Sequence, residues 1–206
     1  MSGAATQPPS ETPDPADEAP AAARLRDSRA FSPPAAVATV VLAAVVAAVQ
    51  PTIALGVLRG LLVLTVVPCA VIDAEQRIIP NRITGPAALA ILVAGLALDL
   101  HHEPRRLVWG AAAGLFLLIA SLVHPSGMGM GDVKLLAVMG LALGAPVVIA
   151  LLVAMLATLL VGVGIAGRQG IRVARKTALP FGPYLALGAV VAAVLAGPLL
   201  HISGHH

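Results

Sequence analysis

Apolar stretches alternate with short polar breaks along most of this chain, from residue 35 onward. Most of the stretches approach the length of about 20 residues that a helix needs to cross a lipid bilayer. The breaks contain Pro, Gly or charged residues, which end helices or lie outside the hydrocarbon core. The shortest stretch is also compatible with a half-span that joins the next helix through Pro146. The pattern predicts spanning helices over residues 35–49, 53–72, 86–100, 107–123, 133–144, 146–166 and 180–200.

Residues 1–30 differ in composition from the rest of the chain. They are rich in Pro, Ala, Glu and Asp, with arginines only near the end. A segment with so little apolar surface to bury cannot offset the entropy of ordering its chain. We expect a disordered tail over 1–30 and a membrane-embedded domain over 31–206. The start lacks the basic region and short apolar core of a cleavable signal peptide, so we expect the tail to be retained.

Composition narrows the class of protein. Of the 206 residues, 58% are hydrophobic and 11% are charged, against roughly 45–50% and about 25% in soluble domains. These proportions exclude soluble enzyme folds, nucleic-acid-binding modules and secreted disulfide scaffolds. Aromatic residues amount to 2%, whereas a transmembrane β-barrel carries aromatic girdles on short alternating strands. We therefore predict an all-α fold: a polytopic transmembrane helical bundle in a lipid bilayer, of about six to seven spans, with no nucleic-acid partner.

The positive charges are distributed unevenly among the predicted breaks. If the N-terminus lies inside, ten of the 13 Lys and Arg residues fall on the inner side. The other three are Arg59, Arg105 and Arg106. Because inner loops of membrane proteins carry the excess of Lys and Arg, we predict a multi-pass protein of the cell inner (plasma) membrane. Its N-terminus is predicted to be cytoplasmic, and all seven stretches are predicted to cross.

Two carboxylates adjoin predicted spanning helices, where charge is costly and by default indicates function. Asp73 follows the second stretch, and Asp132 precedes the fifth. Two crossings separate them in sequence, so both should lie at the cytoplasmic face. Two adjacent carboxylates cannot both ionise cheaply; one stays protonated while the other acts as a base, the arrangement that activates water in aspartic proteolysis. Because such a pair titrates as a unit, we assign the acid and base roles to neither residue.

The charged residues near these helices also have simpler interpretations. Asp132 could serve only as a helix N-cap, and Asp73 as an interfacial charge balanced by Arg77. Glu75 is interpreted as a solvated surface group. Lys134 is interpreted as an anchor at the inner face, with electrostatic tuning of Asp132 as the alternative.

The acids of the predicted outer loop have an ordinary explanation. Asp99 and Glu103 lie beside Arg105 and Arg106 in sequence, and we interpret all four as hydrated loop charges. Cys69 lies four residues before Asp73, so a helix places both on one face; we interpret the thiol as a packing group.

Three short motifs carry a resemblance to a known family. Residues 129–135 (GMGDVKL) resemble the GxGDxKL motif of the type IV prepilin peptidases, membrane aspartic proteases that process pilin-like precursors. Asp73 followed by IPN at 79–81 is similar to that family's first aspartate and its I-P-N turn. Residues 180–183 (PFGP) are similar to its P-F-G-P segment. The three motifs occur in the family's order.

The resemblance implies a membrane aspartic endopeptidase in which Asp73 and Asp132 are the catalytic pair. The enzyme would remove the short basic leader of a prepilin-like membrane substrate at the cytoplasmic membrane face, without a metal or other cofactor. The motif residues expected to support the site or bind substrate are Pro80, Asn81, Gly129, Gly131, Lys134, Phe181, Gly182 and Pro183.

The cysteine content distinguishes two forms of that family. Larger members carry an insertion with paired Cys-x-x-Cys motifs and also N-methylate the product. This chain has one cysteine, Cys69, and so resembles the short form without the insertion. We expect neither methyl transfer nor the S-adenosylmethionine and zinc that go with it.

Two other functions stay open at the level of the sequence. Two intramembrane carboxylates also suit a small cation or proton transporter, although such a path does not need the I-P-N and P-F-G-P segments. An inactive pilus-assembly factor would bind a pilin-like partner without cleaving it. Loss of the leader from a co-expressed precursor would distinguish a peptidase from both.

Overall fold

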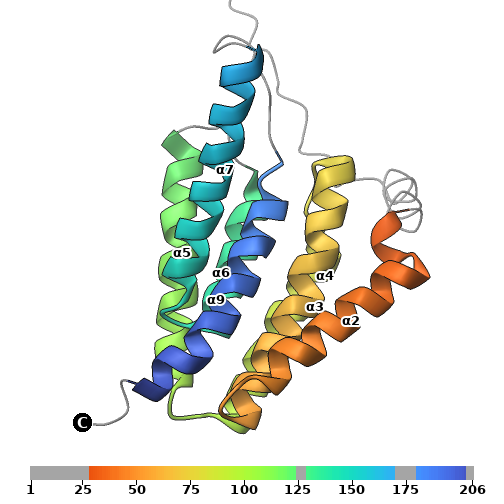
Figure 1. Cartoon of the computed structure of the whole chain (residues 1–206). Coiled ribbons are helices and arrows are strands. Elements are labelled where there is room, and N and C mark those ends of the chain that lie inside the picture. The colour runs from red at the N-terminus through yellow and green to blue at the C-terminus, as the bar shows by residue number, and fades with distance from the viewer. Residues whose placement is uncertain (1–27, 124–128, 170–179, 203–206) are drawn as a thin grey trace, which may run out of the picture.

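The described part of the chain is built from α-helices. In the computed structural model the residues described are 28–123, 129–169 and 180–202, and over these the chain forms seven α-helices, one 3-10 turn and no strand (Figure 1). The all-α prediction is confirmed, and the seven helices correspond one for one to the predicted stretches. The elements in chain order are η1 (Arg29–Phe31), α2 (Pro33–Ala48), α3 (Ile53–Gln76), α4 (Asn81–Leu98), α5 (Glu103–Val123), α6 (Met130–Leu143), α7 (Val147–Gln169) and α9 (Gly182–Ile202).

Four helices, α3, α4, α5 and α7, are long and apolar enough to cross a membrane. The helix α2 and the described part of α9 are apolar but shorter. The helix α6 has 14 residues and is the shortest of the α-helices, as its predicted stretch was. By the length and composition of its helices, the chain is a helical membrane protein.

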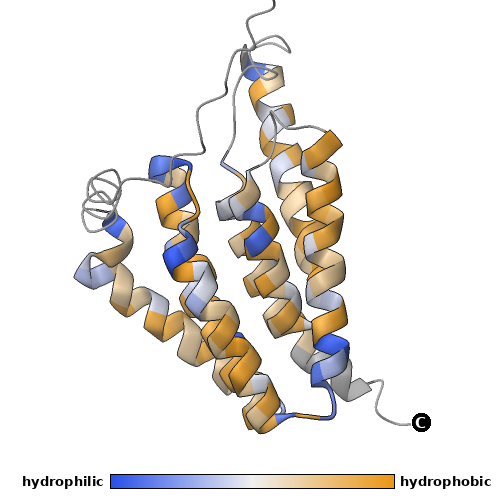
Figure 2. Cartoon of the chain, turned by 180° about the vertical axis from the view of Figure 1, so that it is seen from behind, coloured by the Kyte–Doolittle hydropathy of each residue, from blue (hydrophilic) through white to orange (hydrophobic). Residues whose placement is uncertain are grey.

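The helix α3 occupies the centre of the bundle. In its most apolar window 61% of the residues are buried, against 11–22% in α4, α5 and α7. It packs against α2, α4, α6 and α9, while α5 packs on α6 and α7 on α9 (Figure 1). Leu58, Leu62 and Val66 of α3 are fully buried in the same core as Ala189 and Ala193 of α9. Figure 2 shows apolar residues on the outer helix faces as well, which is typical of helices that contact lipid.

Glycines allow two of these helix pairs to approach closely. A Cβ atom added to Gly140 of α6 would lie 2.7 Å from the Cα atom of Gly110 in α5. A Cβ atom added to Gly188 of α9 would overlap the backbone of Ala150 in α7. Small residues at such crossings permit the close packing that holds helices together in lipid. These crossings fix α6 and α9, both of which carry motif residues at their first turns.

The polar break predicted after the second stretch is mostly helical. The helix α3 continues to Gln76, and α4 begins at Asn81, five residues earlier than predicted. The predicted boundaries were wrong because hydropathy marks where a helix leaves the membrane, whereas polar residues extend a helix readily. Arg77 ends α3 in the left-handed conformation (φ 56°), and Pro80 precedes α4 as its N-cap. Asp73 therefore lies inside the last turn of α3 rather than after it.

The last residues of the predicted tail, 28–30, contact the end of α3. Ser28 Oγ donates a hydrogen bond to Glu75 Oε2 (2.7 Å), and the N–H of Arg29 donates to Glu75 Oε1 (3.3 Å). Ser28 and Ala30 are buried. Composition could not reveal this contact, because it depends on an acidic residue 46 positions away. Glu75 is exposed as predicted, but it binds the N-terminal segment. The rest of the predicted tail lies outside the described residues.

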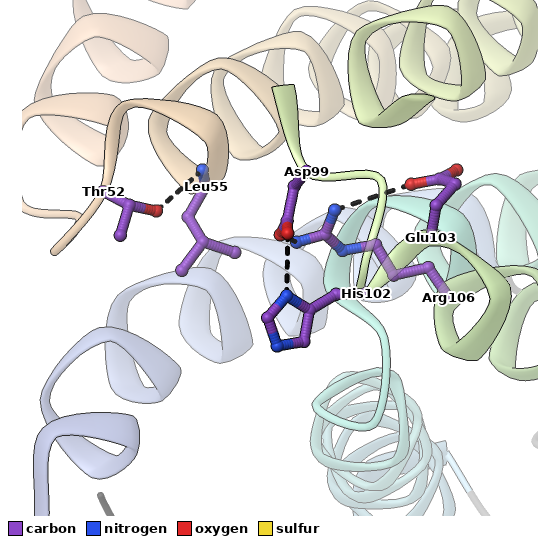
Figure 3. Close-up of polar contacts among 6 residues, drawn as sticks. All are labelled: Thr52, Leu55, Asp99, His102, Glu103 and Arg106. Carbon is purple, nitrogen blue, oxygen red and sulfur yellow. Dashed lines mark hydrogen bonds and ion pairs between the residues drawn. The ribbon is translucent and has the colours of Figure 1, made fainter. Parts of the chain in front are cut away.

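Charged residues meet where α4 ends and α5 begins (Figure 3). Arg106 Nη2 donates a hydrogen bond to Asp99 Oδ2 (2.6 Å), and His102 Nδ1 lies 2.7 Å from Asp99 Oδ1. Arg106 Nη1 lies 3.5 Å from Glu103 Oε2. The hydrated-loop interpretation is wrong for Glu103 and Arg106, which are buried because α5 begins at Glu103 and its first turn packs into the bundle. Arg59, also predicted at the outer side, is fully buried in α3.

Candidate active site

Asp73 is held against the start of α9. Its side chain lies in the last turn of α3 and is buried. The N–H of Gly182, the first residue of α9, donates a hydrogen bond of 2.8 Å to Asp73 Oδ2. A Cβ atom added to Gly182 would lie 2.8 Å from that oxygen and 2.9 Å from Asp73 Cβ. The first N–H groups of a helix have no partner inside the helix, so the PFGP segment supplies Asp73 with a free backbone donor and with the space to reach it.

Asp132 lies in the first turn of α6 and is also buried. Gly129 is the N-cap of this helix, and its N–H donates a hydrogen bond of 3.3 Å to Asp132 Oδ2. Asp132 thus binds the helix start from the third helical position, whereas the simpler interpretation placed it at the N-cap itself. Its other oxygen, Oδ1, is buried and has no hydrogen-bond partner among the described residues. The helix end therefore accounts for only one of the two carboxylate oxygens.

The two carboxylates lie at the same end of the bundle. The last turn of α3 and the first turn of α6 belong to helices that pack against each other, and the charge of Asp73 acts electrostatically on the Asp132 carboxyl group. In each residue one oxygen, Oδ2, accepts a hydrogen bond from an N–H at the start of a helix. Helix starts carry partial positive charge, which favours negative charge at this end. Two buried carboxylates so placed cannot both ionise cheaply and can hold one proton between them.

The I-P-N turn joins the two halves of this site. Ile79 is buried, and a Cβ atom added to Gly131 would lie 2.7 Å from Ile79 Cβ. Asn81 Oδ1 accepts a hydrogen bond of 2.9 Å from Lys134 Nζ. Both contacts run from the segment after Asp73 to residues that flank Asp132 in sequence. Lys134 is exposed and is bound to α4, a partner that neither interpretation of this residue had anticipated.

The other predicted site residues near these motifs in the sequence are buried or half-buried. Phe181 is half-buried and packs against the core just before Gly182, and Pro183 is half-buried in the first turn of α9. Pro80 is buried. Cys69 is buried one turn before Asp73, in agreement with a packing role. Sequence reasoning missed the donor role of the Gly182 backbone; the signal was the glycine immediately before a proline at the start of a predicted helix.

Among the described residues no three His, Cys, Asp or Glu side chains gather in a way that could hold a metal ion. In the part of the chain that the structure describes, the buried carboxylates at this end of the bundle are Asp73 and Asp132.

Comparison with known proteins places the two aspartates inside a matched region. A family model described as the type IV leader peptidase family matches residues 60–164. The curated prepilin leader peptidase/N-methyltransferase of Bacillus subtilis (strain 168) is 34% identical over 125 residues, which is 60% of this chain and 49% of that protein. The chain therefore spans about half the length of the curated relative that it matches. No solved structure matches the chain.

Proposed function

This chain belongs to the type IV leader peptidase family, and we propose that it is a membrane aspartic endopeptidase that removes the short leader of prepilin-like precursors. Asp73 and Asp132 are the catalytic pair, and no metal or other cofactor takes part. The observation that carries the proposal is the arrangement of the two carboxylates. Both are buried at one end of the bundle, each has Oδ2 fixed by a backbone N–H, and Asp132 Oδ1 is left without a partner.

The chemistry follows from one proton shared between two carboxylates. The ionised carboxylate takes a proton from a water molecule as the water oxygen attacks the carbonyl carbon of the scissile peptide bond. The protonated partner gives its proton to the carbonyl oxygen, which yields a neutral tetrahedral diol. When the C–N bond breaks, the carboxyl group that took the water proton gives it to the leaving amine, and the other carboxylate takes a proton from a hydroxyl group of the diol. The pair then again holds one proton, as at the start. The fixed Oδ2 atoms keep the opposite edges of the carboxylates directed at the reacting groups.

The proposed placement in the cell follows the distribution of charge. Residues 31–206 form the membrane-embedded domain of a protein of the cell inner (plasma) membrane, with the N-terminus in the cytoplasm. The site end of the bundle then faces the cytoplasm, where the leader of a precursor lies before cleavage. The inner Lys and Arg residues favour this orientation, and the apolar outer faces of the helices suit a lipid bilayer as the immediate surroundings (Figure 2).

The proposal is tested by measuring cleavage of a precursor by variants in which the carboxylate of one aspartate is replaced by an amide. The chain is co-expressed with a candidate prepilin, and the mass of the precursor is measured. The unaltered chain should remove the leader, whereas Asp73→Asn and Asp132→Asn should each leave the precursor intact. Glu75→Gln is the matched control, because it makes the same change at an exposed residue two positions from Asp73 and should leave cleavage unchanged.

The alternatives make different predictions in the same experiment. A cation or proton transporter, or an inactive assembly factor, would leave the precursor uncleaved with the unaltered chain. If the unaltered chain cleaves and either Asp→Asn variant cleaves as fast, the assignment of the catalytic pair is wrong.

A further inference from the structure

We propose that Asn81 and Lys134 are positioning residues, which hold the two catalytic carboxylates at the separation that the reaction needs. The inference rests on the proposed function and concerns the same site. Neither side chain has to touch the substrate for this role, because each acts through the helix that it fixes. Two contacts of different kinds, both between the I-P-N turn and the start of α6, carry the inference.

The first contact is steric. Ile79 lies six residues after Asp73 in the sequence, and its side chain is buried. A Cβ atom on Gly131 would lie 2.7 Å from Ile79 Cβ, so the pair is packed as closely as a glycine allows. Because Gly131 immediately precedes Asp132, this contact limits how closely the end of α3 can approach the start of α6.

The second contact is polar and opposes movement in the other direction. Asn81 Oδ1 accepts the hydrogen bond of 2.9 Å from Lys134 Nζ. Asn81 is the first residue of α4, and Lys134 follows Asp132 by two positions in α6. The steric contact resists movement of the I-P-N turn toward α6, and the hydrogen bond resists its movement away from α6. Because this turn directly follows α3, the two contacts together hold the end of α3 at a fixed distance from the start of α6.

The exposure of this pair distinguishes positioning from folding. Both Asn81 and Lys134 are exposed, and an exposed polar pair contributes little to stability because water replaces either partner. Catalytic geometry is more sensitive, since a misplacement of about 1 Å can cost on the order of 100-fold in rate. Loss of the hydrogen bond should therefore lower kcat while the thermal stability of the protein stays the same.

The experiment uses the full chain, purified in detergent micelles, and a prepilin that it cleaves. Asn81→Leu and Lys134→Met each remove one partner at nearly constant shape. Each should lower kcat about tenfold with KM unchanged, since the loss corresponds to a displacement well below 1 Å. The double variant should lose no more than either single variant, because the bond is already absent.

Asn81→Asp keeps an acceptor for Lys134 and should keep kcat. Arg168→Met, which removes an exposed charge at the same end of the bundle, is the control.

A second readout reports directly on the catalytic pair. When the carboxylates move apart they interact less, so the two limbs of the pH–rate profile should approach each other in Asn81→Leu and Lys134→Met. A role limited to folding would lower the melting temperature and leave the profile of the folded fraction unchanged, and that result overturns the proposal. A loss in Lys134→Met without a loss in Asn81→Leu also overturns it, because Lys134 would then act through its charge.

Failure of this inference can be told apart from failure of the proposed function. If Asp73→Asn and Asp132→Asn are inactive while Asn81→Leu keeps the kcat and pH–rate profile of the unaltered chain, only the positioning role is wrong. If either aspartate variant cleaves at full rate, the proposed function itself is wrong. If the fold-loss of kcat in the double variant is the product of the two single losses, Asn81 and Lys134 act independently. That result overturns the proposal that they act as a pair.

Discussion

Gly182→Ala tests whether the start of α9 positions Asp73. The added Cβ atom would lie 2.8 Å from Asp73 Oδ2, whereas ordinary van der Waals contact begins at 3.4 Å. The carboxylate or the helix must therefore shift by about 0.6 Å. Asp73 Cβ, at 2.9 Å, is crowded as well, so rotation of the carboxylate alone cannot relieve the overlap. Gly182 is not among the residues with positive φ, which means that the backbone itself accepts alanine and the effect is confined to this contact.

The size of the effect follows from this displacement. If the carboxylate takes the whole shift, its hydrogen bond to the Gly182 N–H, now 2.8 Å, lengthens beyond the usual range of about 2.7–3.2 Å. A hydrogen bond to a charged group contributes about 1.5–3 kcal/mol, and a misplacement of 1 Å can cost on the order of 100-fold in rate. We expect kcat to fall roughly 10-fold to 100-fold. Overpacking also costs about 1–3 kcal/mol of stability, so Tm should fall by several degrees.

The assay measures kcat, KM and Tm for the full chain in detergent micelles with a cleavable prepilin. The matched control is Gly164→Ala in α7, where an added Cβ atom meets nothing within 4 Å. That variant should keep kcat, and its Tm should stay the same or rise, because alanine forms helix better than glycine by about 1 kcal/mol. Gly182→Ala with a kcat within twofold of the unaltered chain would refute the positioning of Asp73 by α9.

Two further predictions concern stability at other places in the fold. Partial burial raises the pKa of Asp99, but the hydrogen bonds and charges of His102 and Arg106 outweigh this effect and hold the pKa below its usual value. The ionised Asp99 therefore stabilises the native state above pH ~4, and this stabilisation is lost as the pH falls through the pKa that Asp99 has in the folded protein. The stability difference between the unaltered chain and Asp99→Asn, about 1 kcal/mol at neutral pH, should shrink as the pH falls below about 4. Chemical unfolding followed by circular dichroism measures this difference, and a difference that does not change with pH contradicts the ion pair. Gly188→Ala should force α9 away from the backbone of Ala150 in α7. The overpacking should cost about 1–3 kcal/mol of stability and lower the Tm in a thermal melt by several degrees. An unchanged Tm would show that the two helices do not cross this closely.

The fold class and the existence of each helix could be predicted because lipid imposes a strong pattern on sequence. A spanning helix needs about 20 apolar residues, and that requirement is visible without any tertiary information. The ends of the helices were harder, because apolar character stops at the membrane surface while the helix continues. The error at Asp73 is of this kind: the residue is polar and was placed after α3, although the helix continues to Gln76.

The charged residues were predicted less well than the apolar ones. Glu103 and Arg106 were interpreted as hydrated, yet both are buried in the first turn of α5, where Arg106 pairs with Glu103 and with Asp99 at the end of α4. A single sequence does not reveal such pairing, since it depends on which face of a helix turns inward. The same limit hid the contact between Glu75 and Ser28. Burial of a charge is a property of its partners, and partners are set by the tertiary fold.

The need of the two carboxylates for hydrogen-bond donors explains why motifs far apart in the sequence meet at the candidate site. The two carboxylates are buried, and buried polar groups need hydrogen-bond partners from the protein. The ordinary N–H groups of a helix are already bonded within it, and only those at its start are free. Gly129 and Gly182 provide such groups for Asp132 and Asp73, one from each of two helices. A donor at a helix start must also approach the acid closely, which at Gly182 leaves no room for a side chain. The glycine of the P-F-G-P motif therefore follows from the same physical requirement as the aspartate that it serves, whereas Gly131 of the GxGD motif makes room for Ile79 of the I-P-N turn.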